Sequence, residues 1–104
     1  MTVQRDYEIM ILLTEEFNDS EVKDWVLNYA KNLRKFNVSD ISVISRGKRN
    51  LAYSISDKLY DQNKTKGNYI QLNFSSMPKY INNFSNTLKL DSYVLRFLVF
   101  NKNN

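Results

Sequence analysis

The 104-residue chain carries 15 lysines and arginines against 11 aspartates and glutamates, for a net charge of +4, and it has only two glycines. It contains no cysteine and no histidine, which excludes disulfides, zinc knuckles, and thiol or Ser-His-Asp catalysis. Two glycines cannot build a Walker or GxGxxG nucleotide loop either. We therefore expect a single non-enzymatic domain without cofactor or metal, whose mild basic bias suits a polyanionic partner.

The first half of the chain predicts a strand and then a helix. Apolar residues alternate over residues 5–14, which predicts a strand with Ile9, Ile11 and Leu13 on one parity. Over residues 19–36 apolar side chains from Val22 to Leu33 recur at helical spacing and predict an amphipathic helix. No run is long enough to span a bilayer or to form a signal-peptide core, so we expect no membrane association.

The second half returns to strand character. Residues 38–55 surround the basic cluster Arg46-Gly47-Lys48-Arg49, and Gly47 inside a strand pattern indicates a bulge or bend. The polar residues 56–66 predict a hairpin loop, and residues 67–75 alternate again as a strand. Pro78 suits a first helical position, a short amphipathic helix follows it, and residues 93–100 predict a last strand.

The order β-α-β-β-α-β predicts an α+β ferredoxin-like sandwich, a four-stranded antiparallel sheet with two helices on one face. We expect one domain over residues 1–100 and a short polar tail at 101–104. Parity assigns to the helix-covered core the residues Ile9, Ile11, Leu13, Ile70, Leu72, Phe74, Leu95, Phe97 and Val99. It assigns to the open face the residues Met10, Leu12, Tyr69, Gln71, Asn73, Val94, Arg96, Leu98 and Phe100.

The expected open face is less polar than a solvated sheet face usually is, which favours a partner there. The residues that we assign to this partner face are Met10, Leu12, Tyr69, Gln71, Leu98 and Phe100. A protein or RNA would cover it; the alternatives are a tail or a second copy of the chain.

Arginines and lysines near this face are the candidate RNA contacts. Arg96 either reaches a phosphate or base, or packs its stem on neighbours while its head meets water. Arg46, Lys48 and Arg49 either bind phosphates or protect a solvated edge strand. Simple alternation places Arg46 and Lys48 on one face and Arg49 on the other, unless Gly47 bulges.

Several segments together carry a family resemblance. They are Tyr7-Glu8, the run ISVISRGKRNLAYSI with its basic cluster joined to Leu51-Ala52-Tyr53, Lys66-Gly67-Asn68-Tyr69-Ile70-Gln71, Pro78, and Leu88-Lys89-Leu90-Asp91 leading into Val94-Leu95-Arg96-Phe97-Leu98-Val99. In this order and spacing they resemble the bacterial and plastid type of small-subunit ribosomal protein six over nearly the whole chain.

The resemblance implies a ferredoxin-like structural component of the small ribosomal subunit. Such a protein binds the central domain of small-subunit rRNA together with ribosomal protein eighteen, takes no small-molecule substrate and is not an enzyme. It implies RNA or partner contacts at Arg5, at the Arg46–Arg49 run and at Arg96, and a location in the plastid ribosome, or in the bacterial cytoplasm for a bacterial source. A ferredoxin-like homodimeric ligand-binding or regulatory domain is the alternative.

Overall fold

The computed structural model describes the backbone of residues 3–57 and 62–102 and the side chains of residues 3–49 and 66–102. The elements, in chain order, are β1 (Arg5–Thr14), α1 (Asp19–Arg34), β2 (Ser39–Asp57), β3 (Gln62–Ser76), the 3-10 turn η1 (Pro78–Tyr80), α2 (Ile81–Leu90) and β4 (Val94–Asn101). The predicted element order is therefore confirmed.

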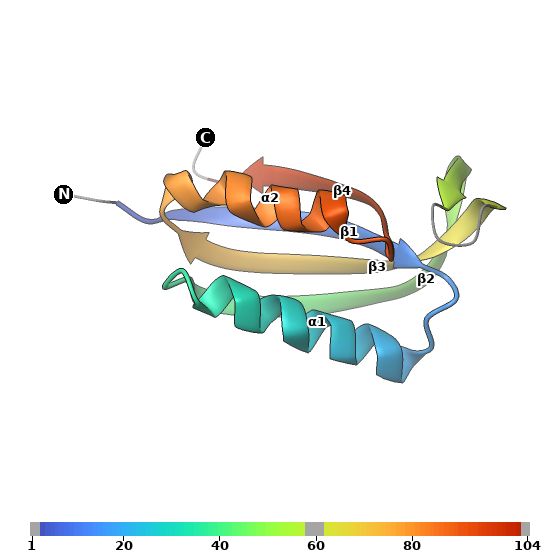
Figure 1. Ribbon diagram of the computed structural model, residues 1–104, viewed down its shortest axis with the longest axis horizontal. Coiled ribbons are helices and arrows are strands. Elements are labelled where there is room, and N and C mark those ends of the chain that lie inside the picture. Colours follow the sequence, from blue (N-terminus) through green and yellow to red (C-terminus); the bar gives the residue numbers. More distant parts are fainter. Residues whose placement is uncertain (1–2, 58–61, 103–104) are drawn as a thin grey trace.

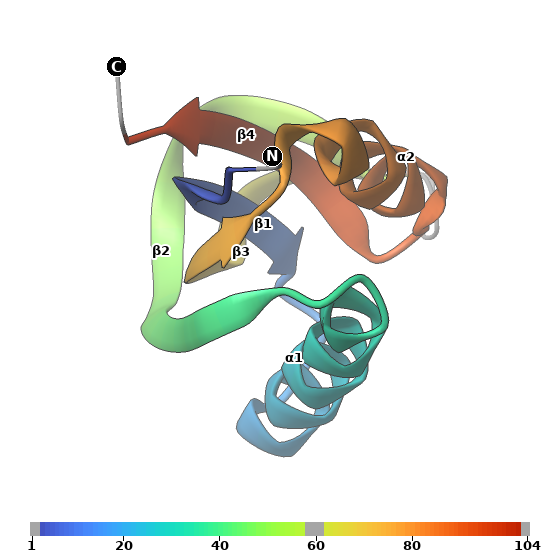
Figure 2. The same ribbon diagram turned by 90° about the vertical axis from the view of Figure 1, so that its left-hand side faces the viewer.

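The strands form one four-stranded sheet in the order β2-β3-β1-β4, and every neighbouring pair is antiparallel. Both helices pack on the same side of the sheet, and the other face carries no element of the described chain (Figures 1 and 2). This is the ferredoxin-like sandwich that the sequence predicts. The hairpin of β2 and β3 extends beyond the helical layer at one end (Figure 1).

The core lies between the sheet and the helices. Ile9, Ile11 and Leu13 are 0% exposed, and so are Ile70 and Leu72 on the neighbouring strand. From α1 the core takes Val22, Val26 and Leu33, and from α2 Phe84 and Leu88. The hydroxyl of Tyr29 donates to the carbonyl oxygen of Phe84 over 3.2 Å, and burial raises the pKa of this tyrosine. That bond joins the two helices across the core.

The helical layer covers β2 incompletely. On the helix-facing parity of this edge strand, Val43 is 41% exposed, and Leu27 of α1 is 50% exposed.

Neither helix in the described part of the chain is long and apolar enough to cross a membrane.

The expected loop at residues 56–66 is wrong in extent. β2 runs to Asp57 and β3 starts at Gln62, with Ile55 opposite Lys64 and Asp57 opposite Gln62. Antiparallel pairing uses backbone groups, so polar residues continue a ladder without an apolar face to bury. Residues 58–61 lie outside the described residues.

The expected parity of β4 also fails at its first residues. A register shift lies between Leu12 and Leu13 of β1, where Leu13 pairs with Val94 and Leu12 pairs with Arg96. Val94 is therefore in the core at 5% exposure, not on the open face, and Leu95 is only half-buried. An extra residue in one strand reverses the alternation, and the sequence pattern does not reveal it. At its far end β4 includes Asn101, one residue past the predicted strand.

Candidate nucleic-acid and protein interface

The register of the paired strands shows which residues lie side by side on the open face of the sheet. Ile44, Gln71, Met10 and Leu98 lie side by side across β2, β3, β1 and β4. The next row towards the carboxyl end of β3 is Ser42, Asn73, Glu8 and Phe100. The next row towards the amino end of β3 contains Tyr69, Leu12 and Arg96. These rows bring together residues that lie far apart in the sequence.

A bulge at Gly47 decides where the basic cluster points. Gly47 has a φ of +76°, a conformation that glycine adopts without strain, and the β2–β3 register shifts between Ser45 and Gly47. Arg46 and Arg49 consequently both line a hollow on the open face, while Lys48 does not. The bulge that the sequence predicts at Gly47 is therefore confirmed, and the alternation that separates Arg46 from Arg49, expected only without a bulge, does not apply.

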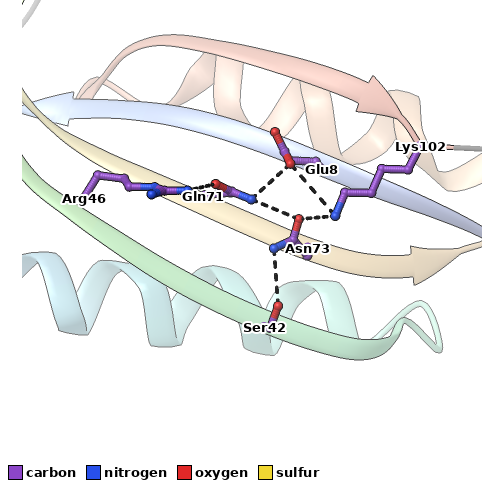
Figure 3. A network of polar contacts seen from close by, with 6 residues as sticks. All are labelled: Glu8, Ser42, Arg46, Gln71, Asn73 and Lys102. Carbon is purple, nitrogen blue, oxygen red and sulfur yellow. Dashed lines mark hydrogen bonds and ion pairs between the residues drawn. The ribbon is translucent and has the colours of Figure 1, made fainter.

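Arg46 is tied into a polar network that crosses the sheet (Figure 3). Its guanidinium donates to Gln71 Oε1 over 2.7 Å, and Gln71 Nε2 donates to Glu8 Oε1 over 3.0 Å. Lys102 Nζ donates to Asn73 Oδ1 over 2.7 Å and lies 3.9 Å from Glu8 Oε1. The amide group of Gln71 thereby fixes the position of Arg46 relative to β1.

Next to this network is a hollow of about 300 Å³ lined by Met10, Arg46, Arg49 and Tyr69. Arg49 Nε donates to the carbonyl oxygen of Arg46 over 3.0 Å, so one contact already orients its side chain. Tyr69 is half-buried. The hollow thus combines an aromatic ring, a thioether and two guanidinium groups.

A second group of basic side chains lies next to the hollow at Arg46 and Tyr69. Lys48, Arg49 and Lys66 line an open recess of about 710 Å³ together with Glu15. Arg49 borders both concavities, so cationic side chains surround the described root of the β2–β3 hairpin. This arrangement presents positive charge on more than one side of the hairpin.

The other two predicted basic contacts differ in position. Arg96 is exposed and opposite Leu12 on the open face, within the row of Tyr69. Arg5 begins β1 on the helix-facing parity, seven residues before Leu12. At about 3.3 Å per residue it lies roughly 23 Å from that row, so the structure does not bring Arg5 into the cluster.

The exposure of the apolar residues on the open face agrees only in part with the prediction. Leu98 and Phe100 are 55% and 45% exposed, and Met10 is half-buried. Leu12, in contrast, is only 4% exposed, because it packs over Gly67, where a Cβ would lie 2.5 Å from Leu12 Cδ1. Leu12 therefore lies on the open face but offers almost no surface to a partner.

Sequence reasoning did not select several residues of this face: Glu8, Ser42, Ile44 and Lys102. Glu8 shares the parity of Met10, so alternation alone could have placed it. Ile44, 41% exposed, joins the apolar surface on the edge strand. Lys102 lies past the predicted end of the last strand, where no periodic signal reaches it.

Among the described residues, no three acidic, cysteine or histidine side chains lie together as a metal site would require. Every described buried side-chain nitrogen or oxygen has a hydrogen-bond partner. The described site presents cationic donors, an aromatic ring and apolar side chains on one face of the sheet.

Comparison with known proteins gives consistent matches. The sequence model of the family described as Ribosomal protein S6 matches residues 6–101. A similar protein is the small ribosomal subunit protein bS6c of Phaeodactylum tricornutum, 76% identical over 98% of this chain and 98% of that protein. The protein of the same name from Trieres chinensis is 64% identical over 98% of this chain and its own full length, 100%.

A bacterial relative and a solved structure extend the comparison. The small ribosomal subunit protein bS6 of Picosynechococcus sp. is 31% identical over 92% of this chain and 78% of its own. The crystal structure of 30S ribosomal protein S6 from Thermotoga maritima superposes with a TM-score of 0.83, at 19% identity, over 96% of this chain and 89% of that one. At this identity the likeness concerns the fold, and it confirms the ferredoxin-like arrangement.

Proposed function

This chain belongs to the ribosomal protein S6 family, and from that premise we propose that it binds the central domain of small-subunit rRNA together with ribosomal protein eighteen. Its place is in the small ribosomal subunit, as a structural protein and not as an enzyme. The described residues act by presenting fixed surfaces to two neighbours.

The plastid ribosome is its location. The two relatives that match at 76% and 64% identity are named bS6c, the plastid type, whereas the cyanobacterial relative, named bS6, matches at 31%. The sequence alone left the bacterial cytoplasm open as a location, but the bacterial relative is less similar to this chain than the two plastid-type relatives.

The observation that carries the proposal is the division of the open face. Arg46 and Arg49 project from one end of it, where the Gly47 bulge brings them together. Leu98 and Phe100 lie exposed further along β4. Guanidinium groups bind phosphates through several donors, and a contiguous exposed apolar patch favours a protein neighbour.

Charge supports RNA as one of these neighbours. Arginines and lysines that neutralise phosphates release counterions, so the affinity should fall as salt rises. Phosphate contacts position a protein more than they specify a sequence, and the protein neighbour would then complete the RNA surface. Lys48 and Lys66 extend the positive surface around the hairpin root.

A gel-shift titration tests the proposal. The wild-type chain is titrated against a central-domain rRNA fragment at two salt concentrations, with and without the protein eighteen homologue. We expect salt-sensitive binding that appears mainly with the partner present. Replacing Arg46, Lys48 and Arg49 together by Ala should weaken binding and lower the salt slope by about one per lost phosphate contact, while circular dichroism stays unchanged.

Arg34→Ala is a single-charge control, because Arg34 is exposed in the last turn of α1 in the helical layer. It removes one positive charge away from the open face and should leave the shift unchanged. Unfolding of the triple variant would show that the cluster is structural. No shift under any condition, together with a stable homodimer in sedimentation, would favour the alternative of a homodimeric regulatory domain.

A further inference from the structure

The hollow lined by Met10, Arg46, Arg49 and Tyr69 has the features of a site for a single nucleotide. We propose that it binds one unpaired RNA nucleotide, with the base against the Tyr69 ring and the phosphate at the two guanidinium groups. The inference rests on the proposed function only for RNA as the ligand, and it deepens that function by naming the kind of RNA that this surface takes.

The size and the lining favour an unpaired base. About 300 Å³ lies at the small end of the range for small-molecule sites, which suits one nucleotide. Bases in an RNA duplex are stacked on each other, and a base reaches an aromatic side chain only when it is unpaired. Tyr69 is half-buried on β3, a strand paired on both sides in the sheet, and its side chain lines the hollow.

The charges favour a phosphate beside that base. None of the described residues lining the hollow is acidic. Arg46 donates to Gln71 and Arg49 Nε donates to the Arg46 carbonyl oxygen, which orients both side chains and uses few of their donors. A guanidinium has five N–H donors, and the remaining ones suit a phosphate.

The nucleotide and a protein neighbour fit on the face together. Phe100 follows Arg96 by four residues on β4, a separation of roughly 13 Å between the Tyr69 row and the Phe100 row. A nucleotide in the hollow therefore leaves Phe100 for the protein partner, whereas Leu98 lies opposite Met10 at the edge of the hollow. The open face would contact both neighbours at separate places.

Fluorescence anisotropy with fluorescein-labelled hexa-uridylate tests the site in the full chain. Tyr69→Leu keeps an apolar side chain but removes the ring, and we expect it to weaken binding roughly five- to a hundredfold. Tyr69→Phe should stay within about twofold of the wild type, since the ring remains. A twelve-base-pair RNA duplex should compete poorly, because its bases are paired.

Two control variants separate this site from general effects. Tyr80→Leu removes another half-buried tyrosine, from η1 past the other end of β3, and should not change the affinity. Arg46→Ala and Arg49→Ala should each weaken hexa-uridylate binding and reduce its salt dependence, whereas Arg34→Ala should change neither. Thermal unfolding of each variant checks that it is folded.

The outcomes distinguish the inference from the proposed function. Absence of hexa-uridylate binding, unchanged affinity in Tyr69→Leu, or equal competition by the duplex would overturn the inference, even if the rRNA fragment binds with protein eighteen. Ring-dependent hexa-uridylate binding without any rRNA-fragment complex would support the inference and overturn the proposed function.

Discussion

At the residue scale, Gly47 and Gly67 flank the same part of the open face under different constraints. At Gly47 the backbone conformation is the constraint, because φ is +76° and, among the described residues beyond its chain neighbours, no heavy atom lies within 4 Å of where a Cβ would be. At Gly67 space is the constraint, because a Cβ would meet Leu12 Cδ1 at 2.5 Å and the Leu13 carbonyl oxygen at 3.0 Å. One glycine permits the bulge that groups the arginines, and the other permits Leu12 to be buried.

The two positions should respond differently to alanine. We expect Gly67→Ala to lower the free energy of unfolding by about 1–3 kcal/mol through overpacking. Gly47→Ala should lower it by about 1 kcal/mol, from backbone strain alone. Urea denaturation measures both.

A double variant tests whether contact with Leu12 causes the loss of stability in Gly67→Ala. Adding Leu12→Ala removes the side chain that the new methyl group meets, so the combined loss should be smaller than the sum of the single losses. Additive losses, or a neutral Gly67→Ala, would show that Leu12 does not constrain this position.

At the element scale, α1 begins at a capping box. The backbone N–H of Glu21 donates to Asn18 Oδ1 over 2.8 Å, and the backbone N–H of Asn18 donates to Glu21 Oε1 over 3.0 Å. Both bonds satisfy N–H groups that have no partner within the helix. Asp19 and Glu21 in the first turn and Lys31 and Arg34 in the last also match the helix dipole.

This cap gives a prediction about α1. Asn18→Ala should lower the free energy of unfolding by about 1 kcal/mol, because it removes the acceptor for the Glu21 N–H. Asn28→Ala is the matched control: Asn28 is exposed inside the helix, where alanine has the higher helical propensity. Chemical denaturation should find that control neutral or slightly stabilised; equal losses in the two variants would refute the capping role.

For some elements the hydrophobic pattern alone is sufficient to predict which residues are buried. Val22, Val26 and Leu33 repeat at helical spacing, and they are buried on α1 as predicted. The parity of β1 and β3 is equally reliable, because each strand buries one face under the helices. The β2–β3 hairpin past Asn50 is longer than the sequence pattern predicts, because backbone pairing extends it without an apolar signal.

At the scale of the whole molecule, β1 is paired on both sides, and β2 and β4 are the edges of the sheet. A central strand has all its backbone groups in ladders, whereas an edge strand of the isolated chain presents unpaired groups on one side. The core residues of β1 are also fully buried. Local opening should therefore start at the edges and reach β1 last.

Amide hydrogen exchange on the free chain measures this order. We expect the slowest exchange at the amides of Ile9, Ile11 and their neighbours in β1. Along β4 we expect alternation between slow and fast amides, because every second N–H points away from β1. Uniform slow exchange along β4 would contradict an open edge there.

The candidate site was predictable in part. Tyr69, Gln71, Leu98 and Arg96 follow from parity once the fold is assumed, and the structure places all four on the open face. The burial of Leu12 was not predictable, since it depends on a glycine on the neighbouring strand. Arg5 was assigned through the family resemblance, and its distance from the other arginines follows only from the length of β1.

The sequence by itself determined the fold class and the order of elements, because periodicity reports locally which face of each strand or helix is buried. The shared segments also identified the family that the comparisons confirm. The tertiary structure alone decided which cationic side chains share a surface: a positive φ at Gly47 places Arg46 and Arg49 beside Tyr69. Gly47 inside a strand pattern indicated a bulge, but the register on either side of it depends on pairing between strands distant in sequence, so the local pattern does not tell which arginines share a face.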